Sequence, residues 1–192
     1  KKFIFNKALL AENLFFQKRY KNSKKMYLSI KPIGSIYSWY ASKSIAAILL
    51  ETEDVEVAAS YLKNEFDSLK KLKLENYYDM ANFYKDNEYY KDSVDYYTLA
   101  LKGLGEKHFL LPKILDRRGS SYERMGEWEK AEKDLKESLR ILPDQPYVLN
   151  YLAYSWIDRG MNIEKSLKML KKADSLREND PYIIDSLGWA HY

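Results

Sequence analysis

Residues 112–145 read PKILDRRGSSYERMGEWEKAEKDLKESLRILPDQ, and this stretch decides the fold. It opens with a proline, which the first turn of a helix tolerates because an N–H there has no intrahelical partner. Apolar residues then recur at steps of three, four and seven, which places them on one helical face. Gly119 and Ala131 are small residues within two such faces, and Gly126 lies between them. We therefore predict an antiparallel pair of helices that turns at Gly126 and packs closely at Gly119 and Ala131.

The same pattern recurs along the chain, which is the first property to look for in a helix-rich sequence. Small residues occupy the slot of Gly119 at steps of 35, 35, 38, 34 and 35 residues: Ala11, Ala46, Ala81, Gly119, Ala153 and Gly188. Small or short residues also occupy the slot of Ala131 in five copies: Ser23, Ala58, Ser93, Ala131 and Ser166. One hairpin cannot bury its own apolar stripe, so neighbouring hairpins must stack.

The repeat predicts an all-α fold, a right-handed superhelix of about five and a half hairpins with 11 helices. We expect helices over residues 4–17, 20–31, 36–51, 55–69, 74–86, 89–106, 112–125, 128–141, 147–159, 163–177 and 182–192. The repeats span about 4–38, 39–73, 74–111, 112–145, 146–180 and an incomplete 181–192, within one continuous solenoid over 1–192. The 38-residue step predicts either a longer second helix or a bulky loop near residues 102–111.

Signals for helix ends agree with these boundaries. Prolines stand where first helices should begin, at Pro112, Pro146 and Pro181. Asp144 and Asp180 precede two of them, and Asn162 is a plausible N-cap. Gly126 and Gly160 follow first helices, where a left-handed residue ends a helix.

These residues resemble the tetratricopeptide-repeat family, in a bacterial-type protein. The resemblance is carried by Gly119 to Tyr122, Ala131 and Pro143, with Leu115 in the large-residue slot. A further copy opens at Asp180 and Pro181 and continues with Ile184, Leu187, Gly188 and Trp189. It covers nearly the whole chain and is strongest from Pro112 onward. Four residues depart from the family pattern: Lys7, Ser42, Glu65 and Arg118.

Catalytic and metal-binding patterns are missing from the sequence. There is no cysteine, no H-E-x-x-H motif, no Walker loop and no nucleophile elbow. His108 and His191 belong to different copies, and we expect His191 to pack in a slot that usually holds tyrosine and His108 to lie on the surface. We therefore predict no enzyme activity, no cofactor and no metal. The longest uncharged runs are also too short to span a membrane.

The resemblance implies that the chain binds a protein or peptide in a concave groove lined by the first helices. The groove slots carry tyrosine, tryptophan and asparagine, which give flat contact area and hydrogen bonds. They are Tyr40, Lys43, Glu75, Tyr78, Asn82, Lys85, Lys113, Asp116, Ser120, Glu123, Tyr147, Asn150, Tyr154, Tyr182, Asp185 and Trp189. The opposing interpretation is that Tyr78, Tyr147 and Tyr154 pack between hairpins, since the chain has 18 tyrosines. A clamp for a carboxylate-terminated ligand is disfavoured, because Lys43 and Lys113 are isolated and acidic residues intervene.

Other functions stay open at this point. The chain could be a structural subunit or adaptor of a multiprotein or envelope assembly that contacts partners through its ends or convex face. A third reading is an RNA-binding helical repeat, but Lys24-Lys25, Lys70-Lys71 and Lys171-Lys172 are expected on second helices, mixed with acidic residues. The incomplete last repeat predicts self-association through an exposed apolar face. The chain has no initial methionine, so we expect a fragment of a longer protein, cytoplasmic or periplasmic.

Overall fold

The computed structural model describes residues 2–33, 35–105 and 107–192, and these residues contain eleven α-helices and no strand. They fall into two compact units, Lys1–Asn87 and Glu88–Tyr192, which are described separately. The first unit holds α1 (Lys2–Phe16), α2 (Tyr20–Ile30), the short 3₁₀ helix η1 (Lys31–Ile33), α3 (Ser35–Thr52), α4 (Val55–Asp67) and α5 (Leu74–Asp86). The second holds α6 (Tyr90–Leu101), α7 (Leu111–Arg124), α8 (Trp128–Ile141), α9 (Pro146–Asp158), α10 (Ile163–Leu176) and α11 (Pro181–His191).

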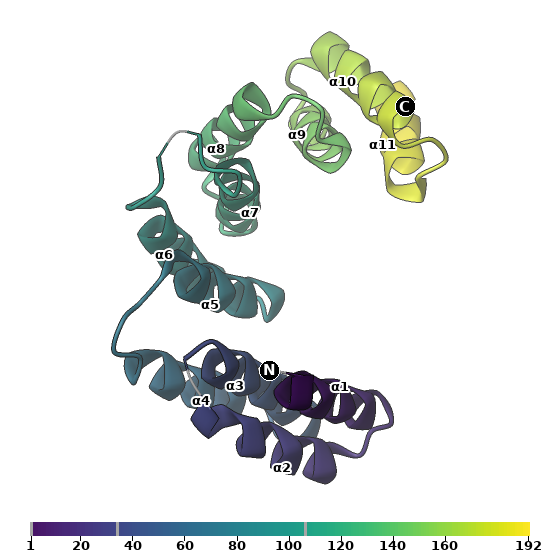
Figure 1. Ribbon diagram of the computed structural model, residues 1–192. Helices are drawn as coiled ribbons and strands as arrows, with labels where there is room; N and C mark the ends of the chain where they lie inside the picture. The colour runs from purple at the N-terminus through teal and green to yellow at the C-terminus, as the bar shows by residue number, and fades with distance from the viewer. Residues whose placement is uncertain (1, 34, 106) are drawn as a thin grey trace. The chain divides into compact units, whose positions relative to one another are not determined.

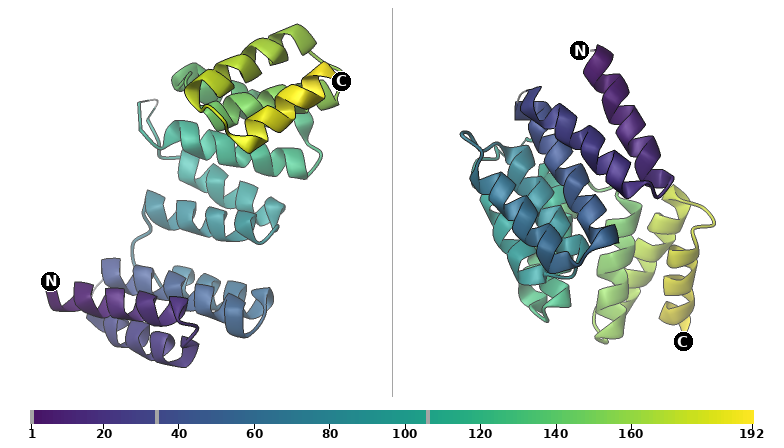
Figure 2. Two further views of the ribbon diagram at one scale, coloured as in Figure 1. Left: turned by 90° about the vertical axis from the view of Figure 1, so that its right-hand side faces the viewer. Right: turned by 90° about the horizontal axis from the view of Figure 1, so that it is seen from below.

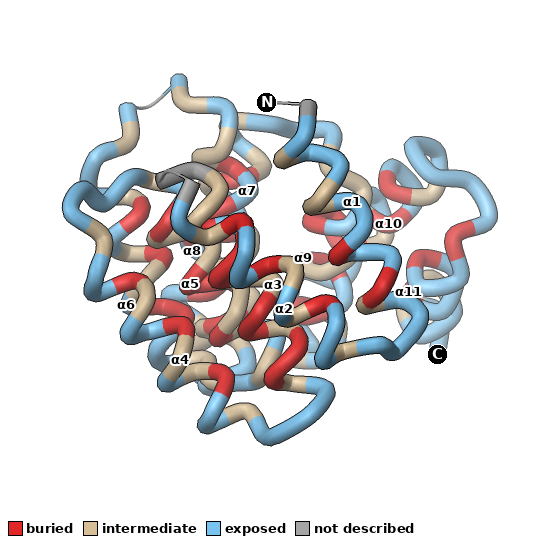
Figure 3. Tube along the Cα trace, turned by 60° about the horizontal axis from the view of Figure 1, so that its bottom comes forward, coloured by how far each residue is buried: buried red, intermediate tan, exposed pale blue. Residues whose placement is uncertain are grey.

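Helices that follow one another in the chain pack as hairpins within each unit. In the first unit α1 packs on α2, α2 on α3, and α3 on α4 (Figures 1 and 2). In the second unit the α7–α8 and α9–α10 hairpins are the most extensively packed pairs, and α11 contacts both α9 and α10. Each helix buries one face only, as the alternation of buried and exposed stretches along the chain shows (Figure 3). The all-α fold of stacked helical hairpins is therefore confirmed.

The small residues of the repeat lie where helices meet. In the first slot Ala11, Ala46, Ala81 and Ala153 are fully buried, and all five residues of the second slot are fully buried as well. A Cβ added at Gly119 would lie 3.1 Å from Leu135 Cγ, 3.2 Å from the Ala131 carbonyl oxygen and 3.3 Å from Asp134 Cβ. The close approach of α7 to α8 thus leaves little room for a side chain at Gly119. At Gly188, in the same slot of α11, nothing lies within 4 Å of such a Cβ.

Two departures from the repeat pattern in the first unit compensate each other. Glu65 stands where a small residue is usual, and Ser42 stands where a large one is usual. The Ser42 hydroxyl donates to Glu65 Oε2 at 2.8 Å, and Lys31 Nζ lies 2.5 Å from Glu65 Oε1. The space left by the short serine is therefore filled by a carboxylate that has both a hydrogen-bond donor and a cation.

The third departure is also explained by a charge pair. Arg118, in place of leucine, donates through Nε and Nη2 to the two oxygens of Asp134 at 2.7 and 2.9 Å. Its Nη1 donates to Thr98 at 3.1 Å, so one guanidinium joins α6, α7 and α8. Asp134 is 5% exposed, and a carboxylate that buried must be paired to remain charged. The fourth departure, Lys7, makes a long contact of 3.4 Å with Ser29, and its Nζ lies 4.9 Å from the centre of the Phe3 ring.

The predicted helix ends hold in most places. Gly126 and Gly160 have φ of 77° and 64°, as left-handed residues that end α7 and α9 should. Asp180 caps α11 by accepting the Tyr182 N–H. Asn162 occupies the N-cap position of α10, as predicted, but its backbone is left-handed and its side chain makes no capping hydrogen bond. Asp144 does not cap α9 either; it pairs with Lys172 at 2.6 Å.

Two predicted boundaries are corrected. α6 ends at Leu101, so the extra residues of the 38-residue step form a loop rather than a longer helix. Gly103 and Gly105 in that loop supply no side chain that could extend the helix core, and glycine weakens a helix. α4 ends at Asp67, so Lys70 and Lys71 lie in the loop that follows and not on a second helix. Lys24 and Lys25 lie on α2, and Lys171 and Lys172 on α10, as predicted.

Candidate functional site

The described residues contain no group of three or more histidine, cysteine or acidic residues that could hold a metal ion. None of the helices formed by these residues is long and apolar enough to cross a bilayer. His108 is half-buried in the loop before α7, where its Nδ1 accepts the Leu110 N–H at 3.2 Å and its ring stacks on Phe109. His191 is exposed, so the expected packing role is wrong. Its counterpart Trp156 is 1% exposed beneath α10, whereas no second helix follows α11 in the described chain.

In the first unit, the predicted residues of α3 are tied into neighbouring helices. Tyr40 is exposed and its ring packs edge-on against Tyr27 at 5.9 Å. Lys43 was predicted to be isolated, and this is wrong: it forms an ion pair with Asp79 of α5 at 2.8 Å. Trp39 Nε1 donates to the same carboxylate at 2.7 Å. Asp79 thus joins two successive first helices. It also pairs with the Lys43 ammonium, which a clamp for a ligand carboxylate would need to be free.

The predicted residues of α5 lie along one helix at varying depth. Glu75 is exposed in the first turn, and the other three are half-buried: Tyr78, Asn82 and Lys85. Tyr78 and Asn82 each make an interaction within the chain. The first unit therefore offers a mixed polar surface rather than a cluster of free charges.

In the second unit, α7 contributes four predicted residues, of which one is exposed. Lys113 is exposed, while Asp116 and Ser120 are half-buried, and the Ser120 hydroxyl donates back to the Arg117 carbonyl at 2.9 Å. Glu123 accepts the Tyr151 hydroxyl at 2.9 Å and pairs with Arg159 at 3.2 Å. Since Tyr151 and Arg159 both lie on α9, Glu123 binds one first helix to the next. Burial, with Glu123 beside it, raises the pKa of the Tyr151 hydroxyl, which therefore stays protonated as a donor.

α9 presents two tyrosines and an asparagine on one face, at steps of three and four. Tyr147 is 47% exposed and Tyr154 is 39% exposed. The Tyr147 hydroxyl donates to Asp180 at 2.9 Å, and the Arg177 guanidinium lies 5.0 Å from its ring centre. Asn150, between the two tyrosines, has a buried side-chain oxygen that accepts no hydrogen bond from the described residues. The interpretation that these tyrosines pack between hairpins thus applies in part to Tyr147. Tyr154 is exposed and available for contact with a partner.

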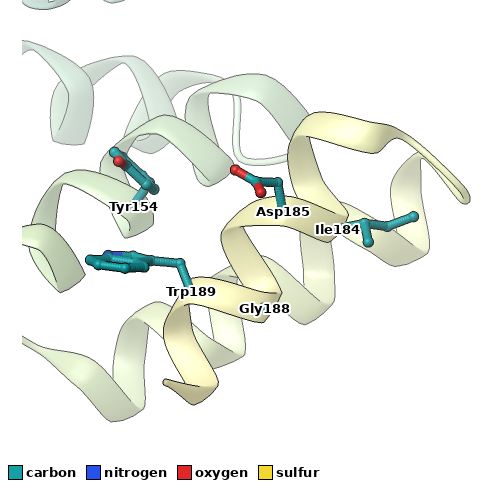
Figure 4. Close-up of a pocket in the computed structure, with 5 residues that line it drawn as sticks. All are labelled: Tyr154, Ile184, Asp185, Gly188 and Trp189. Atoms are coloured by element: carbon teal, nitrogen blue, oxygen red, sulfur yellow. The ribbon is translucent and has the colours of Figure 1, made fainter.

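α11 completes this face beside α9. Trp189 is 47% exposed and stacks on Tyr192, with ring centres 5.8 Å apart. Asp185 is exposed, as is Tyr182 in the first turn. Asp185 and Trp189 of α11, together with Tyr154 of α9, border a hollow of about 420 Å³ between these two helices. Figure 4 shows the Asp185 and Trp189 side chains pointing toward the same side as Tyr154, and Ile184 pointing away from them.

Sequence reasoning assigned Tyr154, Asp185 and Trp189 to a binding face, and the structure brings these three together. It missed Ile184 and Gly188, which also line the hollow. Both were assigned to packing slots, because their counterparts Leu115 and Gly119 are covered by the following helix. The incomplete last repeat predicted an exposed apolar face on α11, but no sequence signal showed that these two residues border a hollow.

Comparison with known proteins agrees with the geometry. The tetratricopeptide-repeat profile matches residues 112–145, the α7–α8 hairpin. A TPR repeat-containing protein of Pseudomonas aeruginosa is 33% identical over 79 residues, which make up 41% of this chain. The matched part is 13% of that relative's length, so the chain corresponds to a small part of it.

Solved structures with the same fold match most of the chain. BtubC from P. vanneervenii has a TM-score of 0.69 at 17% identity, over 91% of this chain and 81% of its own. MamA has a TM-score of 0.65 at 15% identity, over 88% and 94% of the two chains. A chain of the Cut9–Hcn1 hetero-tetramer of APC/C has a TM-score of 0.67 at 10% identity, over 95% of this chain and 35% of its own. These identities establish likeness of fold alone. With the matched repeat, the curated relative and the buried small-residue slots, they identify this chain as a tetratricopeptide-repeat protein.

Proposed function

We propose that this chain is a non-catalytic scaffold that holds a segment of another protein against the exposed face of its first helices. The tetratricopeptide fold supports a protein-interaction scaffold in general, and proteins of this family are typically not enzymes. The proposal concerns the face that α7, α9 and α11 present in the second unit. The corresponding residues of α3 and α5 in the first unit are proposed as contacts of the same kind.

One observation carries the proposal: three large aromatic side chains on neighbouring first helices stay open to solvent. Tyr147, Tyr154 and Trp189 are between 39% and 47% exposed, while the equivalent faces of the second helices carry mainly lysine and glutamate. Tyrosine and tryptophan are enriched at protein interfaces because they supply contact area with few rotatable bonds. Exposed rings in this arrangement are suited to a partner chain laid across the helices.

Asn150 adds a polar anchor within this face. Its side-chain oxygen is buried and accepts no hydrogen bond among the described residues. A buried acceptor without a donor is unfavourable by roughly 1 to 3 kcal/mol. If the amide rotates toward the surface when a segment binds, a backbone N–H of that segment would supply the donor, which gives the asparagine a reason to lie between two exposed tyrosines.

Site-specific crosslinking tests the proposal. A photoreactive phenylalanine analogue is placed at Tyr154 on the proposed face, and at Lys168 on the exposed side of α10 as a control. Irradiation in an extract of the source organism should give a defined protein adduct from position 154 and none from 168. Asn82→Ala with Asn150→Ala should weaken that adduct. Equal adducts from both positions, or none from 154, would contradict the proposed face.

A second candidate function, assembly through the end of the stack, rests on α11. Ile184 is 51% exposed, whereas its counterparts Leu115 and Leu149 are 7% and 5% exposed beneath α8 and α10. An uncovered apolar stripe of this kind favours association. Sedimentation of the chain at micromolar concentration should then show self-association that Ile184→Lys abolishes. A single monomeric species for the unmodified chain would count against it. RNA binding is not proposed, because α9 and α11 contain no lysine or arginine, the cations that phosphates require.

A further inference from the structure

The hollow between α9 and α11 combines aromatic walls with a free carboxylate. Tyr154 and Trp189 border it from the two helices, and Asp185 lies one turn before Trp189 (Figure 4). Stacking on Tyr192 restrains the Trp189 ring, so this wall is partly ordered before a ligand arrives. Among the described residues, Asp185 makes no hydrogen bond or ion pair. A volume of about 420 Å³ admits a side chain and lies within the usual range of ligand sites.

The charge of these two helices is opposite to that of the chain as a whole. The chain has 32 lysine and arginine residues and a net charge of +4. α9 and α11 contain neither residue, and their only carboxylates are Asp158 and Asp185. Both aspartates are exposed. The face that borders the hollow is therefore an acidic, aromatic strip on a basic protein, which attracts cations and repels carboxylates.

From this juxtaposition we propose that the hollow receives the guanidinium of an arginine in the bound protein segment. The inference rests on the proposed function and specifies the partner chemistry at one place on the face. A planar guanidinium stacks on aromatic rings and donates two parallel hydrogen bonds to one carboxylate. Tryptophan gives the strongest cation–π attraction of the aromatic residues. Tyr154 and Trp189 would hold the plane of the group, and Asp185 would accept its N–H donors.

The test uses the whole chain and short peptides that differ by one functional group. The probe acetyl-Gly-Gly-Arg-Gly-Gly-amide is titrated into ¹⁵N-labelled protein, and a matched peptide carries citrulline in place of arginine. Citrulline keeps the shape of the side chain and loses its charge. A lysine peptide serves as the third probe. The readout is the indole N–H signal of Trp189, assigned by its loss in Trp189→Phe.

The arginine peptide should shift the Trp189 signal in a saturable manner. Charge-assisted hydrogen bonds are about twice as strong as neutral ones, so the citrulline peptide should bind at least about tenfold more weakly. Asp185→Asn should weaken arginine binding about tenfold and remove the difference between arginine and citrulline. Asp158→Asn removes a charge from the same strip without touching the hollow and should change binding less than about twofold, because salt screens exposed charges. Lysine should bind more weakly than arginine.

Equal binding of arginine and citrulline, or an unaltered affinity in Asp185→Asn, would overturn the inference. In that case a protein adduct at position 154 would still support the proposed scaffold function. Conversely, the absence of any adduct at 154 would defeat the scaffold function and, with it, the role given to the arginine. The two failures are thus separated by different experiments on the same protein.

Discussion

Replacing Gly119 by leucine tests the repeat geometry most directly. Gly119 lies on α7 where it meets α8, and even a single added carbon would come within 3.1 to 3.3 Å of three atoms. One of these is the Ala131 carbonyl oxygen, which belongs to the backbone and cannot rotate away. Leucine adds three further carbons in that direction, so α7 and α8 must separate or their side chains must leave their preferred rotamers.

The magnitude follows from two opposing terms. Overpacking a well-filled helix contact is unfavourable by about 1 to 3 kcal/mol, occasionally more. Leucine is a better helix former than glycine by about 0.8 kcal/mol, which offsets part of that. Because a single added carbon would already be in tight contact and leucine adds three more, the upper part of the range applies, and we expect a net loss of about 2 kcal/mol. In a chain of this size that lowers the Tm by about 4 to 8 °C.

Gly188→Leu provides a matched control, because Gly188 occupies the same slot of α11. Nothing lies within 4 Å of a Cβ there, so only the helix propensity changes. Stability should rise by up to about 0.8 kcal/mol. Both variants are measured by circular dichroism during thermal and urea unfolding. An unchanged or raised Tm in Gly119→Leu, or equal effects at the two positions, would refute the close approach of α7 and α8.

Two further predictions concern the charged groups of the second unit. Arg118→Leu restores the usual family residue but should destabilise the protein by about 3 kcal/mol in urea unfolding, because Asp134 then stays buried and unpaired. The double variant Arg118→Leu/Asp134→Leu should recover most of that stability. A single variant as stable as the unmodified protein would contradict the pairing. For Glu132, burial acts to raise the pKa, but hydrogen bonds from Lys136 and Trp156 outweigh it and the pKa is lowered. A lowered folded-state pKa means that the stabilisation is present above the unfolded value of about 4.3 and is lost as the pH falls. Glu132→Gln should therefore lower the Tm at pH 7 but match the unmodified protein near pH 3, and a difference that persisted in acid would show that charge is not the cause.

The helices and their order could be predicted because the small-residue slots are a local and periodic signal. Ala46 and Ala58, for example, are twelve residues apart, a spacing that recurs in four copies and fits a helical hairpin, and both are fully buried. The end of α6 was left open between a longer helix and a loop, since residues 102–106 have no strong stop signal other than glycine. Asn162 was correctly placed at the start of α10, but the sequence does not show that its backbone is left-handed and that its side chain therefore makes no capping hydrogen bond.

The candidate site was predicted in part. Tyr154, Asp185 and Trp189 were identified because the repeat register states which positions flank a packing slot, and they line one hollow. Lys43 was misjudged as isolated, because its partner Asp79 is 36 positions away on another helix and no pattern in the sequence connects them. Glu123, which joins Tyr151 and Arg159, was likewise recognised as a surface residue but not as a tie between helices.

Periodicity alone determined that this chain is a series of helical hairpins and which face of each helix is buried, because steps of three and four and a recurring small residue are properties of single helices and their immediate neighbours. The tertiary structure decided which polar groups are paired and which stay open. Arg118 forms an ion pair with Asp134. Asp185 has no such partner among the described residues and lies beside the exposed rings of Tyr154 and Trp189. That difference depends on what each helix packs against. The sequence gives the charge of a side chain, but only the tertiary structure shows which side chains lie close enough to pair with it.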